Sequence, residues 1–168
     1  MSGKVGSLLV AACVAFACGN SPSSPGEAFC KGYCKFAERC GVASADVCPS
    51  ECFDDRPGLA MLSIEGAGRL GDCVSGFDCS TVTDDDLWKS DIQACSVAAA
   101  AAITPTPRLR SFCTALSEAW FDCNTVLSTS DCLDQYGIFS DTVLDELGAC
   151  TEPTSCDTLK SCVEGVLQ

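Results

Sequence analysis

Apolar residues recur at spacings of three and four along two stretches of the chain, residues 30–40 and 113–123. This is the period of an amphipathic α-helix with one buried face. The inner faces are Cys30, Tyr33, Cys34, Ala37 and Cys40, then Cys113, Leu116, Ser117, Trp120 and Cys123. The pattern predicts two similar helices, each with a cysteine at both ends of its inner face.

Residues that cap helices mark further helix starts. They are Thr83 before the acidic run 84–86, Ser140 before Asp141, and Thr154 three residues before Asp157. A hydroxyl cap satisfies a free N–H group, and the following acids oppose the helix dipole. The helix after Thr83 would bury a face made of Trp88, Ile92, Cys95 and Ala99. Since no stretch alternates long enough for a strand, the sequence predicts an all-α fold.

The cysteines divide this helical chain into two parts. Sixteen cysteines in 168 residues indicate a disulfide scaffold in an oxidising compartment. The first even set is Cys30, Cys34, Cys40, Cys48, Cys52, Cys73, Cys79 and Cys95, and the second is Cys113, Cys123, Cys132, Cys150, Cys156 and Cys162. The two sets share a ten-residue separation at their start and a six-residue separation further on. We interpret this as a degenerate internal duplication.

The predicted architecture is therefore two tandem disulfide-stapled helical-hairpin units of three to four short helices each. The first unit covers residues 27–102, a proline-rich linker covers 103–109, and the second unit covers 110–168. Units of this size bury little apolar surface, so the disulfides decide whether they fold.

The sequence suggests a wiring for the cysteines. Cys34 aligns with Ser117 and Cys52 with about Tyr136, so the second unit lacks both members of one pair. This favours a Cys34–Cys52 disulfide, with Cys40–Cys48 and Cys123–Cys132 closing short loops. Alternating helix directions then suggest Cys30–Cys95, Cys73–Cys79, Cys113–Cys162 and Cys150–Cys156.

A second wiring stays open for the first unit. The spacing Cys30-x3-Cys34 and Cys48-x3-Cys52 resembles that of α-hairpinin peptides. The resemblance implies the pairs Cys30–Cys52 and Cys34–Cys48. We favour the first wiring, because the second would require the second unit to break two bonds.

The N-terminus has the pattern of an export signal. Lys4 precedes an uncharged stretch of 13 residues at 5–17, and a bilayer-spanning helix needs about 20. Small residues precede both Cys13 and Cys18, which resembles the lipobox of bacterial lipoprotein signal peptides. The resemblance implies a signal peptide at 1–17, a lipid on Cys18 and a flexible tether at 18–26.

Cysteine parity favours Cys18 as the anchor, because an anchor at Cys13 would leave Cys18 as an odd thiol. Gly19 is not the Asp that retains lipoproteins at the inner membrane, so the same resemblance implies an outer-membrane lipoprotein of the cell envelope. The alternative is an ordinary secretory signal cut near Ala17 and a periplasmic or secreted protein.

The mature chain also resembles the small cysteine-rich predicted lipoproteins of myxobacterial type. The resemblance rests on the two Cys-x3-Cys motifs with a cysteine between them and on the aromatic-x-Cys run 77–79. It implies an envelope location and a repeat architecture, and it implies no activity.

Charge and residue types exclude several functions. The chain has 10 basic and 23 acidic side chains, a net charge of −13, and no histidine. The charge argues against a nucleic-acid partner, and without histidine there is no Ser-His-Asp or Cys-His nucleophile. No Cys-x2-Cys or calcium-loop motif is present. The run 66–71 matches G-x-G-x-x-G, but without a preceding strand we expect a glycine-broken helix end or loop.

The adjacent Trp120 and Phe121 are the candidate contact surface, because neighbours on a helix diverge and one of them is expected to be exposed. We expect no catalytic residue, no cofactor and no metal. The favoured function is an envelope-anchored structural or protein-binding module that is not an enzyme. Its partner would be an unknown protein or a cationic molecule. The alternatives are a carrier of an apolar ligand and a carboxylate-based hydrolase.

Overall fold

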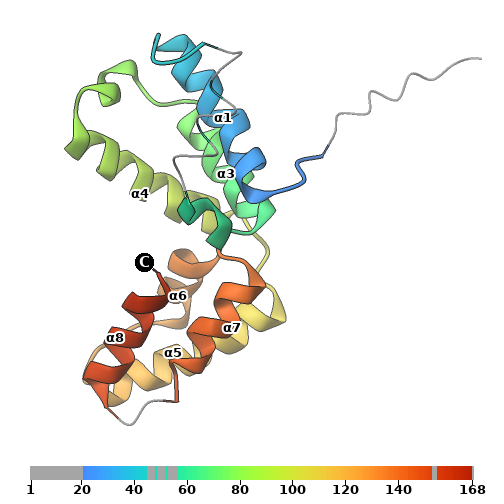
Figure 1. Cartoon of the computed structure of the whole chain (residues 1–168). Helices are drawn as coiled ribbons and strands as arrows, with labels where there is room; N and C mark the ends of the chain where they lie inside the picture. The colour runs from blue at the N-terminus through green and yellow to red at the C-terminus, as the bar shows by residue number, and fades with distance from the viewer. Residues whose placement is uncertain (1–20, 45–47, 49–51, 53–56, 153–154, 168) are drawn as a thin grey trace, which may run out of the picture.

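The computed structural model describes residues 21–44, 48, 52, 57–152 and 155–167, and its elements are helical, which confirms the all-α prediction. The elements, in chain order, are α1 (Pro25–Arg39), η1 (Pro57–Met61), α3 (Ile64–Val74), η2 (Cys79–Val82), α4 (Asp85–Ala101), α5 (Pro107–Asp122), α6 (Thr129–Tyr136), α7 (Asp141–Ala149) and α8 (Cys156–Val166). Figure 1 shows α1, α3 and α4 on one side of a junction and α5 to α8 on the other.

The helix starts lie close to their predicted positions. Ser140 caps α7 as expected, and its Oγ accepts from the N–H of Val143. The two other caps lie one residue further on, at Asp84 for α4 and Ser155 for α8. Asp84 is the better cap because its carboxylate accepts two N–H groups at once.

Two predicted boundaries move because proline begins a helix. Pro25 opens α1 after the cap Ser24, so the helix includes the last two residues of the predicted tether. Pro107 opens α5 after the cap Thr106, which shortens the linker to 103–106. We call the helical part before this linker the first unit and the part from Pro107 onward the second unit.

Each unit has its own apolar core. The first is formed by α1, α3 and α4 around Phe29, Phe36, Leu70 and Val74, and the second by α5 to α8 around Leu116, Leu144, Leu147 and Leu159. The predicted inner face of α4 is confirmed, since Cys95 and Ala99 are buried and Trp88 and Ile92 pack against the first core.

The two units meet through a reciprocal pair of backbone hydrogen bonds around an isolated bridge between Leu62 and Phe139. The N–H of Ser63 donates to the carbonyl of Ile138, and the N–H of Ser140 donates to the carbonyl of Met61, both at 2.9 Å. Ile138 belongs to the first core, and Met61 packs against the second. Phe139 also packs against the first core, so each unit contributes side chains to the core of the other.

Seven disulfides join the fourteen cysteines at positions 30–162, in a wiring that differs from the favoured one. The pairs are Cys30–Cys52, Cys34–Cys48, Cys40–Cys79, Cys73–Cys95, Cys113–Cys132, Cys123–Cys156 and Cys150–Cys162. The favoured pairs 34–52, 40–48, 123–132, 30–95, 73–79, 113–162 and 150–156 are all wrong. The pairs that the α-hairpinin resemblance implied, 30–52 and 34–48, are the ones formed.

The error has a geometric cause. Cys40 and Cys123 are the C-caps of α1 and α5, and each pairs with the first residue of a later helix, Cys79 of η2 or Cys156 of α8. The favoured wiring joined Cys40 and Cys123 to the nearby Cys48 and Cys132, whereas the pairs formed join cysteines that are 39 and 33 residues apart.

Without the pair Cys34–Cys48, both units have the same connectivity. Numbering the six remaining cysteines of each unit in order, the first pairs with the third, the second with the fifth and the fourth with the sixth. Six cysteines allow 15 connectivities. Cys52 therefore matches Cys132, and we call residues equivalent when they stand at the same distance from matching cysteines.

The G-x-G-x-x-G run lies within α3, so the expectation of a helix end or loop was wrong. Its glycines let other backbones approach. A Cβ on Gly71 would lie 2.5 Å from the carbonyl oxygen of Phe29 in α1, and one on Gly66 would meet the backbone of Ile138. These contacts place α3 directly against α1 and against the second unit, so the run has a packing role.

Candidate binding surface

The predicted contact residues lie in the last turn of α5 and point to different surroundings. Trp120 packs partly against the second core, while Phe121 is 73% exposed. The expected divergence is therefore present, and Phe121 is the member of the pair that a partner can reach.

A tight reversal after α5 places more apolar surface beside Phe121. Asn124 adopts a left-handed conformation with φ of 56°. The N–H of Asn124 donates to the carbonyl of Phe121, and the N–H of Thr125 donates to that of Trp120. This is a Schellman ending, in which the two bonds satisfy carbonyls that the helix leaves free. The chain then turns back, and Val126 follows with 88% of its surface exposed.

Phe121 and Val126 border an open hollow of about 380 Å³, which we call the Phe121 hollow. Its lining is Ser117, Glu118, Phe121, Asp122, Val126, Leu127, Ser128 and Thr129. Leu127 is partly buried against the second core and forms an apolar floor. The carboxylates of Glu118 and Asp122 stand on the α5 side, so the hollow is apolar with an acidic rim.

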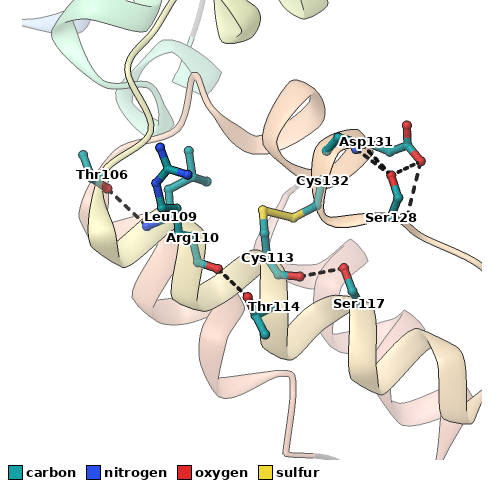
Figure 2. Close-up of a disulfide and its surroundings, with 10 residues drawn as sticks. Thr106, Leu109, Arg110, Cys113, Thr114, Ser117, Ser128, Asp131 and Cys132 are labelled. Carbon is teal, nitrogen blue, oxygen red and sulfur yellow. Dashed lines mark hydrogen bonds between the residues drawn. A yellow bond between two sulfur atoms is a disulfide. The ribbon is translucent and has the colours of Figure 1, made fainter.

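The walls of this hollow are held by covalent and hydrogen bonds, which Figure 2 shows. The disulfide Cys113–Cys132 joins α5 to α6. Ser117 donates to the carbonyl of Cys113 at 2.7 Å, and Ser128 with Asp131 forms a capping box at the start of α6. A partner would therefore meet a preformed surface, which lowers the entropy cost of binding.

A second hollow lies on the other side of Asp122, where α5 and α7 end and α8 begins. We call it the Ser155 hollow; it measures about 260 Å³. It is lined by Ala119, Asp122, Cys123, Thr151, Ser155, Cys156 and Leu159. The disulfide Cys123–Cys156 runs along it. The two hollows share Asp122 in their linings and both lie at the end of α5.

The ionisable groups with shifted pKa lie away from both hollows. Hydrogen bonds from Ser23 lower the pKa of Glu27, and hydrogen bonds from Ser80 lower that of Asp78. Burial raises the pKa of Tyr136. Among the described residues, no group of three or more Cys, Asp or Glu is arranged to hold a metal ion. The fourteen cysteines of the disulfides offer no thiolate.

Sequence reasoning found Phe121 but missed Val126 and the Ser155 hollow. A signal for Val126 was present, because Asn124 directly follows the helix-ending Cys123 as Gly41 follows Cys40. Glycine or asparagine at this position indicates a chain reversal. The signal for the Ser155 hollow was that the second unit has Asp122 at the position where the first unit has Arg39.

The predicted signal peptide and Cys18 lie outside the described residues. Within those residues no helix combines the length and apolarity needed to cross a membrane. The seven disulfides are compatible with an extracytoplasmic protein. No protein-family model, curated protein or solved structure matches the chain.

Proposed function

We propose that this protein is a binding module of the bacterial cell envelope, anchored by a lipid on Cys18, that takes a protein partner at the end of its second unit. The observation that carries the proposal is the exposure of two large apolar side chains, Phe121 and Val126, that line one preformed hollow. Exposed aromatics in pockets with fixed walls are typical of binding hot spots.

The charge of the surface indicates the class of partner. Glu118 and Asp122 border the hollow, and its lining includes no Lys or Arg. The whole chain has a net charge of −13. A segment with an apolar side chain flanked by basic residues would fill the hollow and complement its rim. We therefore infer that the partner is a basic protein segment with an apolar anchor.

The anchor and the repeat complete the proposal. A lipid at Cys18 would leave residues 19–24 as a tether between the membrane and α1, so the second unit would stand away from the bilayer. The common disulfide connectivity supports two copies of one repeat, of the kind that the myxobacterial-type lipoproteins contain. In this proposal the first unit acts as a spacer from the membrane, and the second unit binds the partner.

The two alternatives have less support. An apolar carrier requires an enclosed cavity, whereas both hollows open to solvent and have polar groups in their linings. A carboxylate hydrolase requires an acid with a raised pKa, whereas the shifted carboxyl groups, Glu27 and Asp78, have lowered pKa values.

Short Gly/Ser peptides that contain one Leu followed by one Arg test the proposal. We expect the Leu-Arg peptide to shift the amide NMR signals of residues 117–129 in the full chain, and a Ser-Arg peptide to bind more weakly. Phe121→Ser should weaken binding of the Leu-Arg peptide about tenfold.

Val97→Ser is the matched control, because Val97 is an exposed apolar residue of α4, 43% exposed, and lines neither hollow. It should leave the affinity unchanged. Equal weakening by Val97→Ser, or equal binding of the Leu-Arg and Ser-Arg peptides, would contradict the proposal.

A further inference from the structure

In the first unit, an arginine of the chain itself binds backbone carbonyls at the end of the unit. Arg39, which immediately precedes Cys40, donates from Nη1 to the carbonyl of Ser75 at 2.7 Å and from Nη2 to the carbonyl of Phe77. Its guanidinium lies over the ring of Phe36, 5.9 Å from the centroid. Phe36 in turn packs against Phe77 and Trp88. At the end of the first unit a cation thus lies on an aromatic cluster. Phe36 and Trp88 of this cluster also line an open hollow of about 230 Å³.

The second unit has the same backbone wiring but different side chains at this place. Ala119 is equivalent to Phe36, and Asp122 is equivalent to Arg39. The segment 157–161, between the fifth and sixth cysteines, contains no aromatic residue, whereas the matching segment of the first unit contains Trp88. The result is the Ser155 hollow, lined by both Ala119 and Asp122.

The electrostatics of the Ser155 hollow favour a cation. α5 and α7 both end beside the hollow, and the C-terminal end of a helix dipole is negative. α8 begins there and contributes one positive end, so the helix dipoles together favour a cation. Asp122 adds a full negative charge, and the lining contains no basic residue. Two cations of the second unit pair with acids outside the hollow: Arg108 with Asp141 and Asp145, and Lys160 with Glu164.

The size of the hollow limits what can enter it. Small-molecule sites measure about 300–1,000 Å³, while this hollow has about 260 Å³. A single long side chain fits such a volume. A guanidinium suits it better than an ammonium, because its planar fork can bond a carboxylate and backbone carbonyls at the same time.

We propose that the Ser155 hollow is a pocket for an arginine side chain of the protein partner, which would take in the second unit the place that Arg39 takes in the first. This inference rests on the proposed function and extends it, since the Leu of the partner would occupy the Phe121 hollow and its Arg the neighbouring one. Asp122, which lines both hollows, would be the carboxylate that the arginine pairs with.

The test compares the Leu-Arg peptide with a Leu-citrulline peptide, in which a neutral group of almost the same shape replaces the guanidinium. The full chain should bind the Leu-citrulline peptide about fivefold more weakly. The Leu-Arg peptide should also shift the amide signals of Thr151, Ser155 and Leu159, and the Leu-citrulline peptide should not.

Variants of Asp122 separate charge pairing from general attraction. Asp122→Asn should weaken the Leu-Arg peptide about fivefold and leave the Leu-citrulline peptide unchanged. Glu146→Gln is the control, because it removes the same charge from an exposed acid of α7 that lines neither hollow. Asp122→Arg should place a guanidinium of the protein itself in the hollow, at the position that Arg39 has in the first unit. This variant should therefore bind the Leu-Arg and Leu-citrulline peptides with equal affinity.

The outcomes distinguish this inference from the proposed function. Equal affinity of the Leu-Arg and Leu-citrulline peptides, with Phe121→Ser still weakening both, would overturn the arginine pocket and keep the binding module. An equal effect of Asp122→Asn and Glu146→Gln would overturn the arginine pocket as well. No amide shift with either peptide would overturn both proposals.

Discussion

The two units share a wiring and differ at one end. In both, the helix with the first two matching cysteines ends in a Schellman motif, at Gly41 in the first unit and at Asn124 in the second. Beyond this common ending, Arg39 of the first unit binds two backbone carbonyls and lies over Phe36, whereas Ala119 and Asp122 of the second unit line the Ser155 hollow. The disulfides fix where the helices lie, and a few side chains decide which charge and which rings their ends present.

The largest expected effect concerns the shared wiring itself. Removing Cys40–Cys79 by double substitution to Ser, or the matching Cys123–Cys156, should each lower the free energy of unfolding by about 4 kcal/mol, because these disulfides span 39 and 33 residues. Denaturant unfolding under non-reducing conditions measures both losses.

The disulfide that the second unit lacks is the control for this comparison. Removing Cys34–Cys48, which spans 14 residues, should cost about 3 kcal/mol. A large loss for Cys40–Cys79 with none for Cys123–Cys156 would show that the matching disulfides do not play the same part in the two units.

A smaller effect on stability is expected from replacing the equivalent glycines Gly71 and Gly148 by alanine. The two replacements should change the free energy of unfolding in opposite directions. A Cβ on Gly71 would lie 2.5 Å from the carbonyl oxygen of Phe29, while one on Gly148 would have no atom within 4 Å. Gly71→Ala should therefore destabilise the protein by about 2 kcal/mol through overpacking. Gly148→Ala should stabilise it by up to about 1 kcal/mol through helix propensity.

Thermal unfolding of the two glycine variants measures this difference. Stabilisation by both variants would mean that α1 and α3 do not approach each other as closely as the structure shows. It would also remove the packing role of the 66–71 run.

The smallest expected effect is a pH dependence that only one unit has. Asp78 caps η2, and its equivalent Ser155 caps α8. Hydrogen bonds from Ser80 lower the pKa of Asp78 below its ordinary value of 3.8. A lowered pKa in the folded state means that the cap stabilises the fold above pH 3.8 and loses this contribution as the pH falls below that value.

Hydrogen exchange at the Ser80 amide measures this loss. Protection should fall with pH below 3.8 in the natural chain and stay constant in Asp78→Asn, since asparagine caps a helix without titrating. An equal loss of protection in Asp78→Asn would assign the pH dependence to another group.

Local features of this fold could be predicted from the sequence, and pairings in space could not. Spacings of three and four predicted the buried Cys30 and Ala37 of α1 and the buried Cys113 and Leu116 of α5, and cap chemistry predicted Ser140. The predicted faces did not include Phe29, Phe36 and Phe112, which are buried as well. The partner of Cys40 depends on where η2 lies, 39 residues later, which no local pattern records. The alignment of Cys48 with Cys132, in place of Cys52, then led to the wrong missing disulfide.

The candidate site shows the same limit. Helix geometry predicts that Trp120 and Phe121 point in different directions and that one of them is exposed. The exposed residue is Phe121. The Ser155 hollow forms where the second unit has Ala119 at the position of Phe36 in the first unit. The hollow could be recognised only by comparing the two units, once the matching disulfides Cys40–Cys79 and Cys123–Cys156 showed that α8 begins beside the end of α5.

The reciprocal hydrogen bonds between the units have a consequence for how such a molecule can diversify. Ser63 and Ser140 are equivalent, as are Met61 and Ile138, so exchanging the units exchanges the two bonds. This is the isologous contact of a two-fold dimer, in which the two chains are identical and their ends must therefore be identical too. Because here both halves belong to one chain, a mutation reaches only one of them, and one end can keep its own arginine while the other gains a ligand.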